Sequence, residues 1–312
     1  MQSISPLVGD AGVSIEVFAD LGTRAEQMLA QGEEMFSWIP NAYVKYPCTH
    51  EGLRAAQMSV HESIRVNMTL CFSQEQAAAV YAATKGSKEP VYVSPFAGRL
   101  DDRGEDGMGL VGNIKKMYER SDGHVHVLAA SIRSVNHLLC SFALGAELAT
   151  VPSGVLDEWA AAGFPMPDQH FRYQGVDAGG NLLKVIPYKE LDLNLPWESF
   201  DIAHQLTTKS IQKFVADYQS TLRRSAQCLQ ALVETSLPRL FNSVHLECRM
   251  PRQVPDRFGD VIKQPKGISV PTHAVTRYVP FGSPEVGFWE IRNDKRASGN
   301  RPIAGEKPTS QY

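Results

Sequence analysis

The sequence predicts an α/β fold, and the first reason is the alternation of two kinds of segment. Between residues 13 and 151, short apolar runs alternate with stretches in which apolar residues recur every three or four positions. Strict alternation of this kind indicates parallel strands joined by crossover helices. The apolar runs are nearly continuous, which is typical of strands covered on both faces. A chain of 312 residues with 43% hydrophobic content can bury a core of this size.

Six β-α units can be placed in chain order. The predicted strands are residues 13–20, 42–47, 64–73, 90–96, 124–131 and 146–152. The predicted helices are residues 23–39, 49–62, 73–84, 107–121, 134–145 and 153–163. Each helix gathers its apolar residues on one face, which is the face expected to pack against the sheet.

Polar side chains in the late part of these strands, or just after them, decide between two architectures. They are Glu16, Lys45, Asn67, Thr69, Ser94, Arg99, Ser131 and Arg133. In a parallel barrel such positions meet at one mouth, where the active site is built. An open doubly wound sheet is the alternative, but no strand is followed by a glycine-rich phosphate loop of the GxGxxG or GxxxxGK kind. We therefore predict a TIM (β/α)8-type barrel.

Composition argues against several classes of protein. The net charge of −3 gives no reason to expect nucleic acid or a membrane surface as partner. The five cysteines form no C-x-x-C pair, so neither a disulfide framework nor a zinc ribbon is indicated. The N-terminus lacks the pattern of a secretory signal, and no apolar stretch is long enough to span a bilayer. We expect a cytoplasmic protein.

The segment "NAYVKYPCTHEG" places Lys45 at the end of an apolar strand. A lysine is costly to bury, and a strand-end lysine can also extend its amine to solvent. Burial in apolar surroundings favours the uncharged amine, which is the form that attacks a carbonyl carbon. Lys45 is therefore a candidate nucleophile for imine formation.

Several motifs together resemble the transaldolase family. "VKYPCTHEGLRA" is similar to the family's "VKIPxTxEGL", "VNMTLCFS" to "xNxTLxFS", and "VYVSPFAGRLDD" to "YVSPFVGRxDD". "VLAASIRS" resembles the phosphate-binding segment, and "ATVP" resembles the last strand. The resemblance covers roughly residues 13–220, in the family's order, and is closest to the short bacterial transaldolases and fructose-6-phosphate aldolases.

The resemblance implies a role for each candidate residue. Lys45 would form a Schiff base with the substrate ketone, while Glu16 and Thr69 would orient a water that moves protons. Asn67 would hydrogen-bond the substrate or intermediate. The remaining members of the predicted site are Ser94 and Phe96 along the substrate chain and Arg99, Ser131 and Arg133 around its phosphate. No metal and no organic cofactor is implied.

Two positions indicate which branch of the family the chain resembles. Glu16 is a glutamate, as in transaldolases, where the aldolase branch has glutamine. Phe96 stands where the aldolases have tyrosine, and a phenyl ring cannot act as an acid or base. Both favour transfer of a dihydroxyacetone unit between sugar phosphates, as in the pentose phosphate pathway of carbohydrate metabolism.

The resemblance begins at what would be the third strand of the family's barrel. Neither the strand carrying an aspartate that works with the lysine nor the following "TTNPS" segment is found. We therefore expect a barrel of six β-α units, incomplete at the N-terminus, whose two open sheet edges favour self-association. Two alternatives to a transaldolase stay open: a fructose-6-phosphate aldolase-type lyase, and a catalytically silent relative.

Three regions follow from these observations. They are an N-terminal tail (1–12), the transaldolase-like barrel (13–221) and a C-terminal extension (222–312). Basic residues outnumber acidic ones only in the extension, which we expect to be irregular or disordered. "TTKSIQKFVADYQ" resembles the terminal helix through which short family members pack between subunits, so we expect a homo-oligomer.

Overall fold

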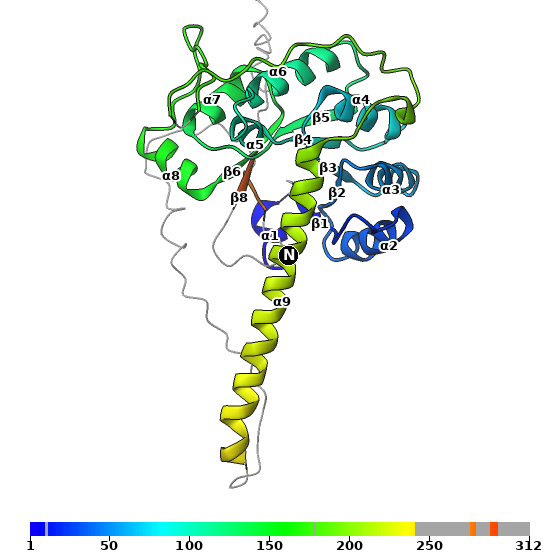
Figure 1. Cartoon of the computed structure of the whole chain (residues 1–312), viewed down its shortest axis with the longest axis vertical. Helices are drawn as coiled ribbons and strands as arrows, with labels where there is room; N and C mark the ends of the chain where they lie inside the picture. The colour runs from blue at the N-terminus through cyan, green and yellow to red at the C-terminus, as the bar shows by residue number, and fades with distance from the viewer. Residues whose placement is uncertain (10–11, 178, 241–274, 279–287, 293–312) are drawn as a thin grey trace, which may run out of the picture.

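The computed structural model describes residues 1–9, 12–177, 179–240, 275–278 and 288–292, with side chains up to residue 223. Six parallel strands follow one another in chain order across a curled half-barrel, and helices alternate with them on its outside (Figure 1). The predicted incomplete (β/α) barrel of six units is confirmed.

The elements of the half-barrel follow the predicted order closely. Its strands are β1 (Val13–Glu16), β2 (Ala42–Pro47), β3 (Val66–Cys71), β4 (Val91–Pro95), β5 (Val125–Ala129) and β6 (Leu148–Pro152). Its helices are α2 (Ala25–Phe36), α3 (His50–His61), α4 (Gln74–Ala83), α6 (Gly107–Tyr118), α7 (Val135–Ala143) and α8 (Ser153–Ala161). Two short helices that the periodicity did not indicate are α1 (Ser5–Val8) and α5 (Ala97–Asp101). A 3-10 turn, η1 (Trp197–Ser199), lies beyond the half-barrel.

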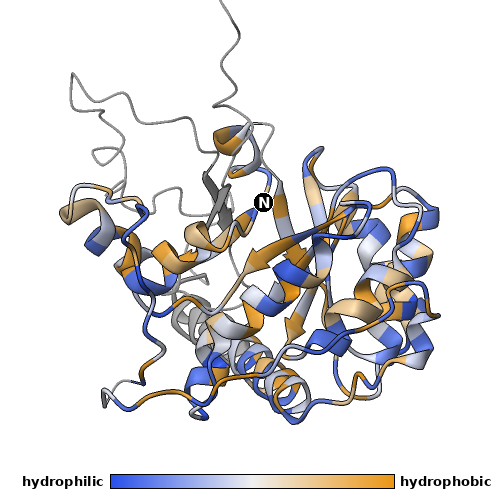
Figure 2. Cartoon of the chain, turned by 90° about the horizontal axis from the view of Figure 1, so that it is seen from above, coloured by the Kyte–Doolittle hydropathy of each residue, from blue (hydrophilic) through white to orange (hydrophobic). Residues whose placement is uncertain are grey.

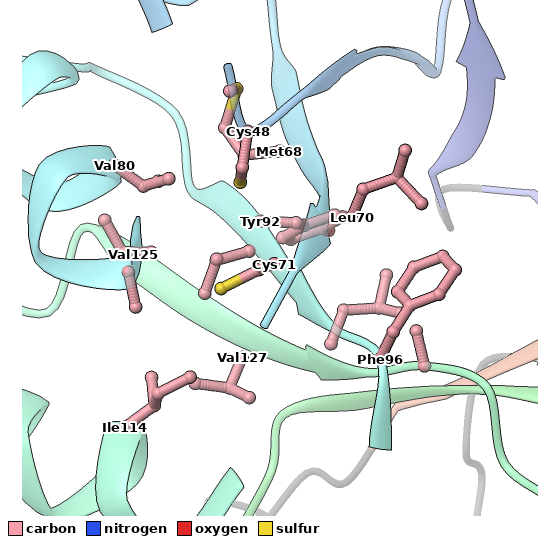
Figure 3. Close-up of a cluster of buried hydrophobic side chains, with 14 of the residues drawn as sticks. Cys48, Met68, Leu70, Cys71, Val80, Tyr92, Phe96, Ile114, Val125 and Val127 are labelled. Atoms are coloured by element: carbon pink, nitrogen blue, oxygen red, sulfur yellow. The ribbon is translucent and has the colours of Figure 1, made fainter. Parts of the chain in front are cut away.

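The core lies on both faces of the strands, as their apolar sequences predict. Every residue of β2, β3 and β4 is buried. Figure 2 shows the apolar strands at the centre and the polar outer sides of the helices around them. In Figure 3, Val80 of α4 and Ile114 of α6 lie near Val125 and Val127 of β5. The helices therefore supply one wall of the core and the strands supply the other.

Several helices that follow a strand start with a short polar N-cap residue. The hydroxyls of Thr49, Ser73 and Ser134 each accept a hydrogen bond from a backbone N–H in the first turn of α3, α4 and α7. These caps satisfy donors that the helix itself leaves unpaired. Each turn from strand to helix is thereby fixed, which fixes the residues at the carboxyl end of the strand.

The strand register places the predicted site residues side by side. Glu16 on β1 pairs with Lys45 on β2, and Lys45 pairs with Asn67 on β3. Register partners in a parallel sheet point to the same face. Between Met68 and Cys71 the pairing with β4 is interrupted by a bulge, and Leu70 has a left-handed φ of 59°. Bulges of this kind redirect side chains and are frequent next to active sites.

Helix α9 (Gln205–Leu240) runs from the carboxyl ends of the strands past the rest of the half-barrel (Figure 1). The helix continues unbroken through residue 221, where the sequence analysis placed the end of the barrel region. The residues of the predicted terminal helix, 207–219, lie within it. No helix in the described part of the chain combines the length and the apolar character needed to cross a bilayer.

A hairpin from the C-terminal extension joins the sheet. Strand β8 (Phe288–Arg292) pairs antiparallel with β6, and β7 (Val275–Tyr278) pairs antiparallel with β8 and comes close to β1. The sheet order is therefore β1-β2-β3-β4-β5-β6-β8-β7. The edge of β6, which the sequence analysis left open, is paired. The other parts of the extension, 241–274, 279–287 and 293–312, lie outside the described residues.

Candidate active site

A buried lysine beside a carboxylate forms the centre of the candidate site. Lys45 is 5% exposed. Its Nζ lies 3.6 Å from Oε2 of Glu16, whose side chain is 17% exposed. Of the two placements that the sequence allowed, the lysine therefore has the buried one. Such a pair is strengthened by the low dielectric of its surroundings.

The motif that follows Lys45 fixes the end of strand β2. Thr49 caps α3 by accepting from the N–H of Gly52 at 3.0 Å, and Glu51 accepts from the N–H of Ala25 at 2.8 Å. A Cβ at Gly52 would lie 1.9 Å from the carbonyl oxygen of Pro47, so only glycine fits. These contacts hold the backbone two residues from the lysine against two helices.

Asn67 lies in a buried row of hydrogen bonds inside the half-barrel. Its Nδ2 donates to Oγ of Ser14 at 3.0 Å, and its Oδ1 accepts from Oγ of Ser94 at 2.7 Å. The three side chains come from β1, β3 and β4. Asn67 and Ser94 thus lie at the expected mouth, and their amide and hydroxyl are held in defined orientations next to Lys45.

Thr69 differs from its neighbours because its hydroxyl is buried without a partner. The residue is 0% exposed, and its Oγ1 has no hydrogen-bond partner among the described residues. Buried polar groups almost always have one, so an unpaired hydroxyl suits a group that meets a substrate or a water. Thr69 directly precedes Leu70, at the bulge of β3.

The ring of Phe96 lies near both Lys45 and Arg99. Lys45 Nζ lies 6.0 Å from its centroid, and Cζ of Arg99 lies 5.3 Å from the same centroid. Burial lowers the pKa of Arg99 from its ordinary value, and the positive charge of Arg133 lowers it further. An anion placed near both guanidinium groups would relieve that repulsion.

The loop after β5 brings Ser131 and Arg133 to the same end of the half-barrel. Ser131 has a left-handed φ of 58°, an uncommon conformation for a residue other than glycine. Arg133 is exposed and donates from Nη2 to Oδ2 of Asp102 at 2.9 Å. Of the nine predicted residues, contacts and register join Glu16, Lys45, Asn67, Ser94, Phe96 and Arg99. The loop with Ser131 and Arg133 lies against the helix that carries Arg99, and Thr69 follows Asn67 two positions later on β3.

The first half of α9 lies across this mouth. Arg99 donates a hydrogen bond to Oγ of Ser210, and its Cζ lies 5.1 Å from the ring centroid of Phe214. The ring centroids of Phe18 and Tyr218 are also 5.1 Å apart. A cavity of about 420 Å³ lies between α9 and the loop after β1. Its lining residues are Asp20, Leu21, Gly22, Ile211, Gln212, Val215, Ala216 and Gln219. None of the nine predicted residues lines this cavity.

Sequence reasoning missed several residues that shape the site. In the sequence, Ser14 looks like an ordinary polar residue of a strand. Because it precedes Glu16 by two positions, it faces the same side of the sheet, and this was the one available indication of its contact with Asn67. Ser210 and Phe214 are remote in sequence from the site. Among the described residues, no group of three or more histidine, cysteine or acidic side chains has the arrangement of a metal site.

The arrangement is suited to chemistry on a carbonyl compound that carries an anionic group. A buried amine lies beside a carboxylate, and the unpaired Thr69 hydroxyl belongs to the neighbouring strand. Together they offer a nucleophile and groups that hold a water or move a proton. Arg99 contacts the same Phe96 ring as the amine, and Arg133 is close enough for its charge to lower the pKa of Arg99. A substrate with a carbonyl at one end and a phosphate at the other would fit these two centres.

Comparison with known proteins agrees with the motifs. A family model described as Transaldolase/Fructose-6-phosphate aldolase matches residues 1–225. A probable transaldolase of Maricaulis maris is 35% identical over 209 residues, covering 67% of this chain and 73% of the relative. One of Bacteroides thetaiotaomicron is 46% identical over 143 residues, covering 46% of this chain and 62% of the relative. One of Paracoccus denitrificans is 42% identical over 148 residues, covering 47% of this chain and 64% of the relative.

The match to these curated relatives is partial in length. The chain spans less than two thirds of the Bacteroides and Paracoccus proteins and somewhat more of the Maricaulis protein. The family model nevertheless covers well over half of the chain, and it includes every residue of the site described above. The chain belongs to the transaldolase/fructose-6-phosphate aldolase family.

Proposed function

We propose that the protein is a transaldolase, which transfers a dihydroxyacetone unit between sugar phosphates through a Schiff base on Lys45. The observation that carries this proposal is the burial of the Lys45 amine beside Glu16 at the mouth of the half-barrel. The curated relatives named probable transaldolase support the same reaction. The reaction would serve carbohydrate metabolism in the pentose phosphate pathway.

In the proposed reaction the amine of Lys45 attacks the ketone carbon of a ketose phosphate. Loss of water gives an imine, which accepts the electron pair of the neighbouring C–C bond when that bond breaks and the adjacent hydroxyl gives up its proton. The aldose product leaves, and the remaining three-carbon enamine adds to the aldehyde of an acceptor. Hydrolysis of the new imine restores the free amine and releases the new ketose.

Glu16 and Thr69 are the groups that would hold the water and move the protons. Glu16 is the carboxylate beside the amine, and the Thr69 hydroxyl is buried and unpaired. Such proton transfers contribute on the order of 10²–10⁴-fold to a rate. Cys48, which also follows β2, is a poor alternative nucleophile because burial raises the pKa of its thiol well above the usual value.

Arg99, Ser131 and Arg133 would bind the phosphate, while Asn67, Ser94 and Phe96 would contact the sugar chain. Guanidinium groups match phosphate oxygens in a bidentate geometry. Phe96 has no hydroxyl, so it cannot supply the acid or base that a tyrosine at this position would bring. Together with Glu16, it favours transfer to an acceptor over release of free dihydroxyacetone.

Borohydride trapping tests the proposal directly. The protein is incubated with fructose 6-phosphate and reduced, and the peptide carrying the adduct is identified by mass spectrometry. We expect an adduct on Lys45 that disappears in Lys45→Met and persists in Lys213→Met, which removes an exposed lysine of α9. No adduct with the substrate bound would favour a catalytically silent relative, and an adduct on a different lysine would overturn the role of Lys45.

A coupled assay with and without an aldose acceptor separates transfer from cleavage. A transaldolase releases little free dihydroxyacetone and consumes the acceptor. Release that does not depend on the acceptor would instead identify a fructose-6-phosphate aldolase-type lyase. The trapping experiment gives an adduct in both cases, so the two measurements test different parts of the proposal.

A further inference from the structure

A buried aspartate–histidine pair lies outside the chemistry proposed above. Nε2 of His137 is 2.9 Å from Oδ2 of Asp101, and the two side chains are 8% and 11% exposed. Neither residue is among the nine of the proposed site. A buried pair of this kind is costly to desolvate, which raises the question of what it positions.

Each partner holds a different segment that carries a proposed phosphate-binding residue. Asp101 ends α5, the helix that carries Arg99, and its Oδ1 accepts from the N–H of Gly107 at 2.9 Å. His137 lies in the first turn of α7, and its Nδ1 accepts from the backbone N–H of Arg133 at 3.4 Å. Because a backbone N–H can only donate, both contacts of the ring are satisfied when its proton is on Nε2.

The two segments are also pressed together along their backbones. The N–H groups of Ala97 and Gly98 donate to the carbonyl oxygens of Ala130 and Ser131, both at 3.0 Å. A Cβ at Gly98 would lie 2.3 Å from the Ser131 oxygen and 2.5 Å from Cγ of Arg133. The two segments that carry the arginines therefore meet at a close junction, and the Asp101–His137 pair lies across it.

We propose that Asp101 and His137 are positioning residues that set the distance between the Arg99 and Arg133 guanidinium groups and so determine affinity for the substrate's phosphate. This inference rests on the proposed function, because it takes these arginines as the phosphate site. The pair acts through the backbone of Arg133 and the end of α5.

Two substitutions of His137 test its two contacts, with Asp101 and with the Arg133 N–H, one at a time. His137→Gln extends an amide N–H toward Asp101 and removes the acceptor for the Arg133 N–H, whereas His137→Asn keeps an acceptor near the Nδ1 position and gives up the contact to Asp101. Asp101→Asn replaces the carboxylate, whose Oδ2 accepts from Nε2 of His137, with an amide. Lys115→Met is the matched control, because it removes another partly buried ion pair, with Glu147, that lies between α6 and the start of β6.

Steady-state kinetics with fructose 6-phosphate and with unphosphorylated fructose provide the readout. We expect each variant of the pair to raise KM for the phosphorylated ketose about tenfold or more, since small misplacements of binding groups are costly. The kcat, and the kcat/KM for fructose, should stay near the wild-type values. Inorganic phosphate, used as a competitive inhibitor, should bind the same variants more weakly, whereas Lys115→Met should behave as wild type.

The outcomes separate this inference from the proposed function. If the wild-type protein distinguishes phosphorylated from unphosphorylated ketose and the pair's variants lose both activities in parallel, the pair is only structural and the inference is overturned. Thermal melts identify a variant that loses activity because it unfolds, and the milder His137→Gln, which keeps a donor toward Asp101, then provides the comparison. If the wild-type protein makes no such distinction, the phosphate site fails, and this inference fails with it.

Discussion

Oε2 of Glu16 lies 3.6 Å from the amine nitrogen of Lys45, and the strand register places the two residues directly opposite each other on β1 and β2. Neighbouring strands in a sheet are separated by about 5 Å, so this contact is built into the backbone and does not depend on a flexible loop. Sites on such rigid elements hold their geometry. The pair is therefore the natural place to begin testing the mechanism.

Glu16→Gln should lower kcat with fructose 6-phosphate and an aldose acceptor by on the order of 10²-fold or more, because the group proposed to move protons is lost. KM should change little, since the amide keeps the size and polarity of the side chain. Glu26→Gln is the control, because Glu26 is an exposed residue of α2 that pairs with Arg54. A wild-type kcat in Glu16→Gln would reduce Glu16 to an ion-pair partner of Lys45.

Thr69→Val should separate stability from activity. The Thr69 hydroxyl is buried and has no partner among the described residues, so its removal should change the free energy of unfolding by less than about 1 kcal/mol. The kcat should nevertheless fall, because the hydroxyl proposed to orient the water is gone. Urea unfolding and steady-state kinetics measure the two effects.

The matched control for Thr69→Val is Thr84→Val. The Thr84 hydroxyl donates to the carbonyl oxygen of Val80 at 2.7 Å and lies 3.1 Å from Nε2 of His124. Its loss should cost about 1–3 kcal/mol and leave kcat unchanged. The reverse pattern, an unstable Thr69→Val with normal kcat, would show that Thr69 only supports the fold.

Phe96→Tyr should increase the release of free dihydroxyacetone relative to transfer. The substitution adds a hydroxyl to a ring that lies near both Lys45 and Arg99. A phenol can hold a water or exchange a proton, and a phenyl ring cannot. The ratio is measured by the coupled assay with and without acceptor. Phe96→Leu removes the ring without adding a hydroxyl, and an equal increase in that variant would contradict the explanation.

The stability of the protein should fall below about pH 6.5 partly because of His204. Burial, and secondarily the charge of Arg103, lowers the pKa of His204 from its ordinary 6.5. Between 6.5 and the lower folded value the unfolded chain binds more protons, so the free energy of unfolding decreases as the pH drops through this window. Above the window, the His204 contribution is fully present.

His204→Phe keeps a ring stacked on Phe72, whose centroid lies 5.3 Å from that of His204, and removes the titrating group. Melting temperatures at about pH 7.5 and about pH 5 should differ less in this variant than in the wild type. His170→Phe, at an exposed histidine, should keep the wild-type difference. An unchanged pH dependence in His204→Phe would assign the effect to other groups.

The sequence predicted the half-barrel well because its signals are local. Apolar runs between capped helices indicate each strand independently, and Lys45 and Asn67 follow as register partners once the strands are parallel. The helices α1 and α5 are too short to show periodicity. The left-handed φ of Leu70 leaves no sequence mark, because strain in a residue other than glycine is set by its surroundings.

Long-range contacts made up most of what the sequence could not indicate. The course of α9 over the mouth depends on the contacts of Arg99 with Ser210 and Phe214, which lie more than a hundred positions away along the chain. The pairing of His137 with Asp101 likewise joins two elements whose separation no spacing rule predicts. Such contacts follow from the packed fold, which a single sequence does not display.

The antiparallel pairing of β8 with β6 bears on how the protein is made. Pro152 on β6 pairs with Phe288 on β8. During synthesis, the residues of β8 must therefore be added before β6 and β8 can pair. Until then a nascent chain presents the bare backbone of β6 to any other strand it meets. Pairings between such distant segments form slowly. Refolding of the full-length chain should therefore show a late phase, and its yield should fall as protein concentration rises.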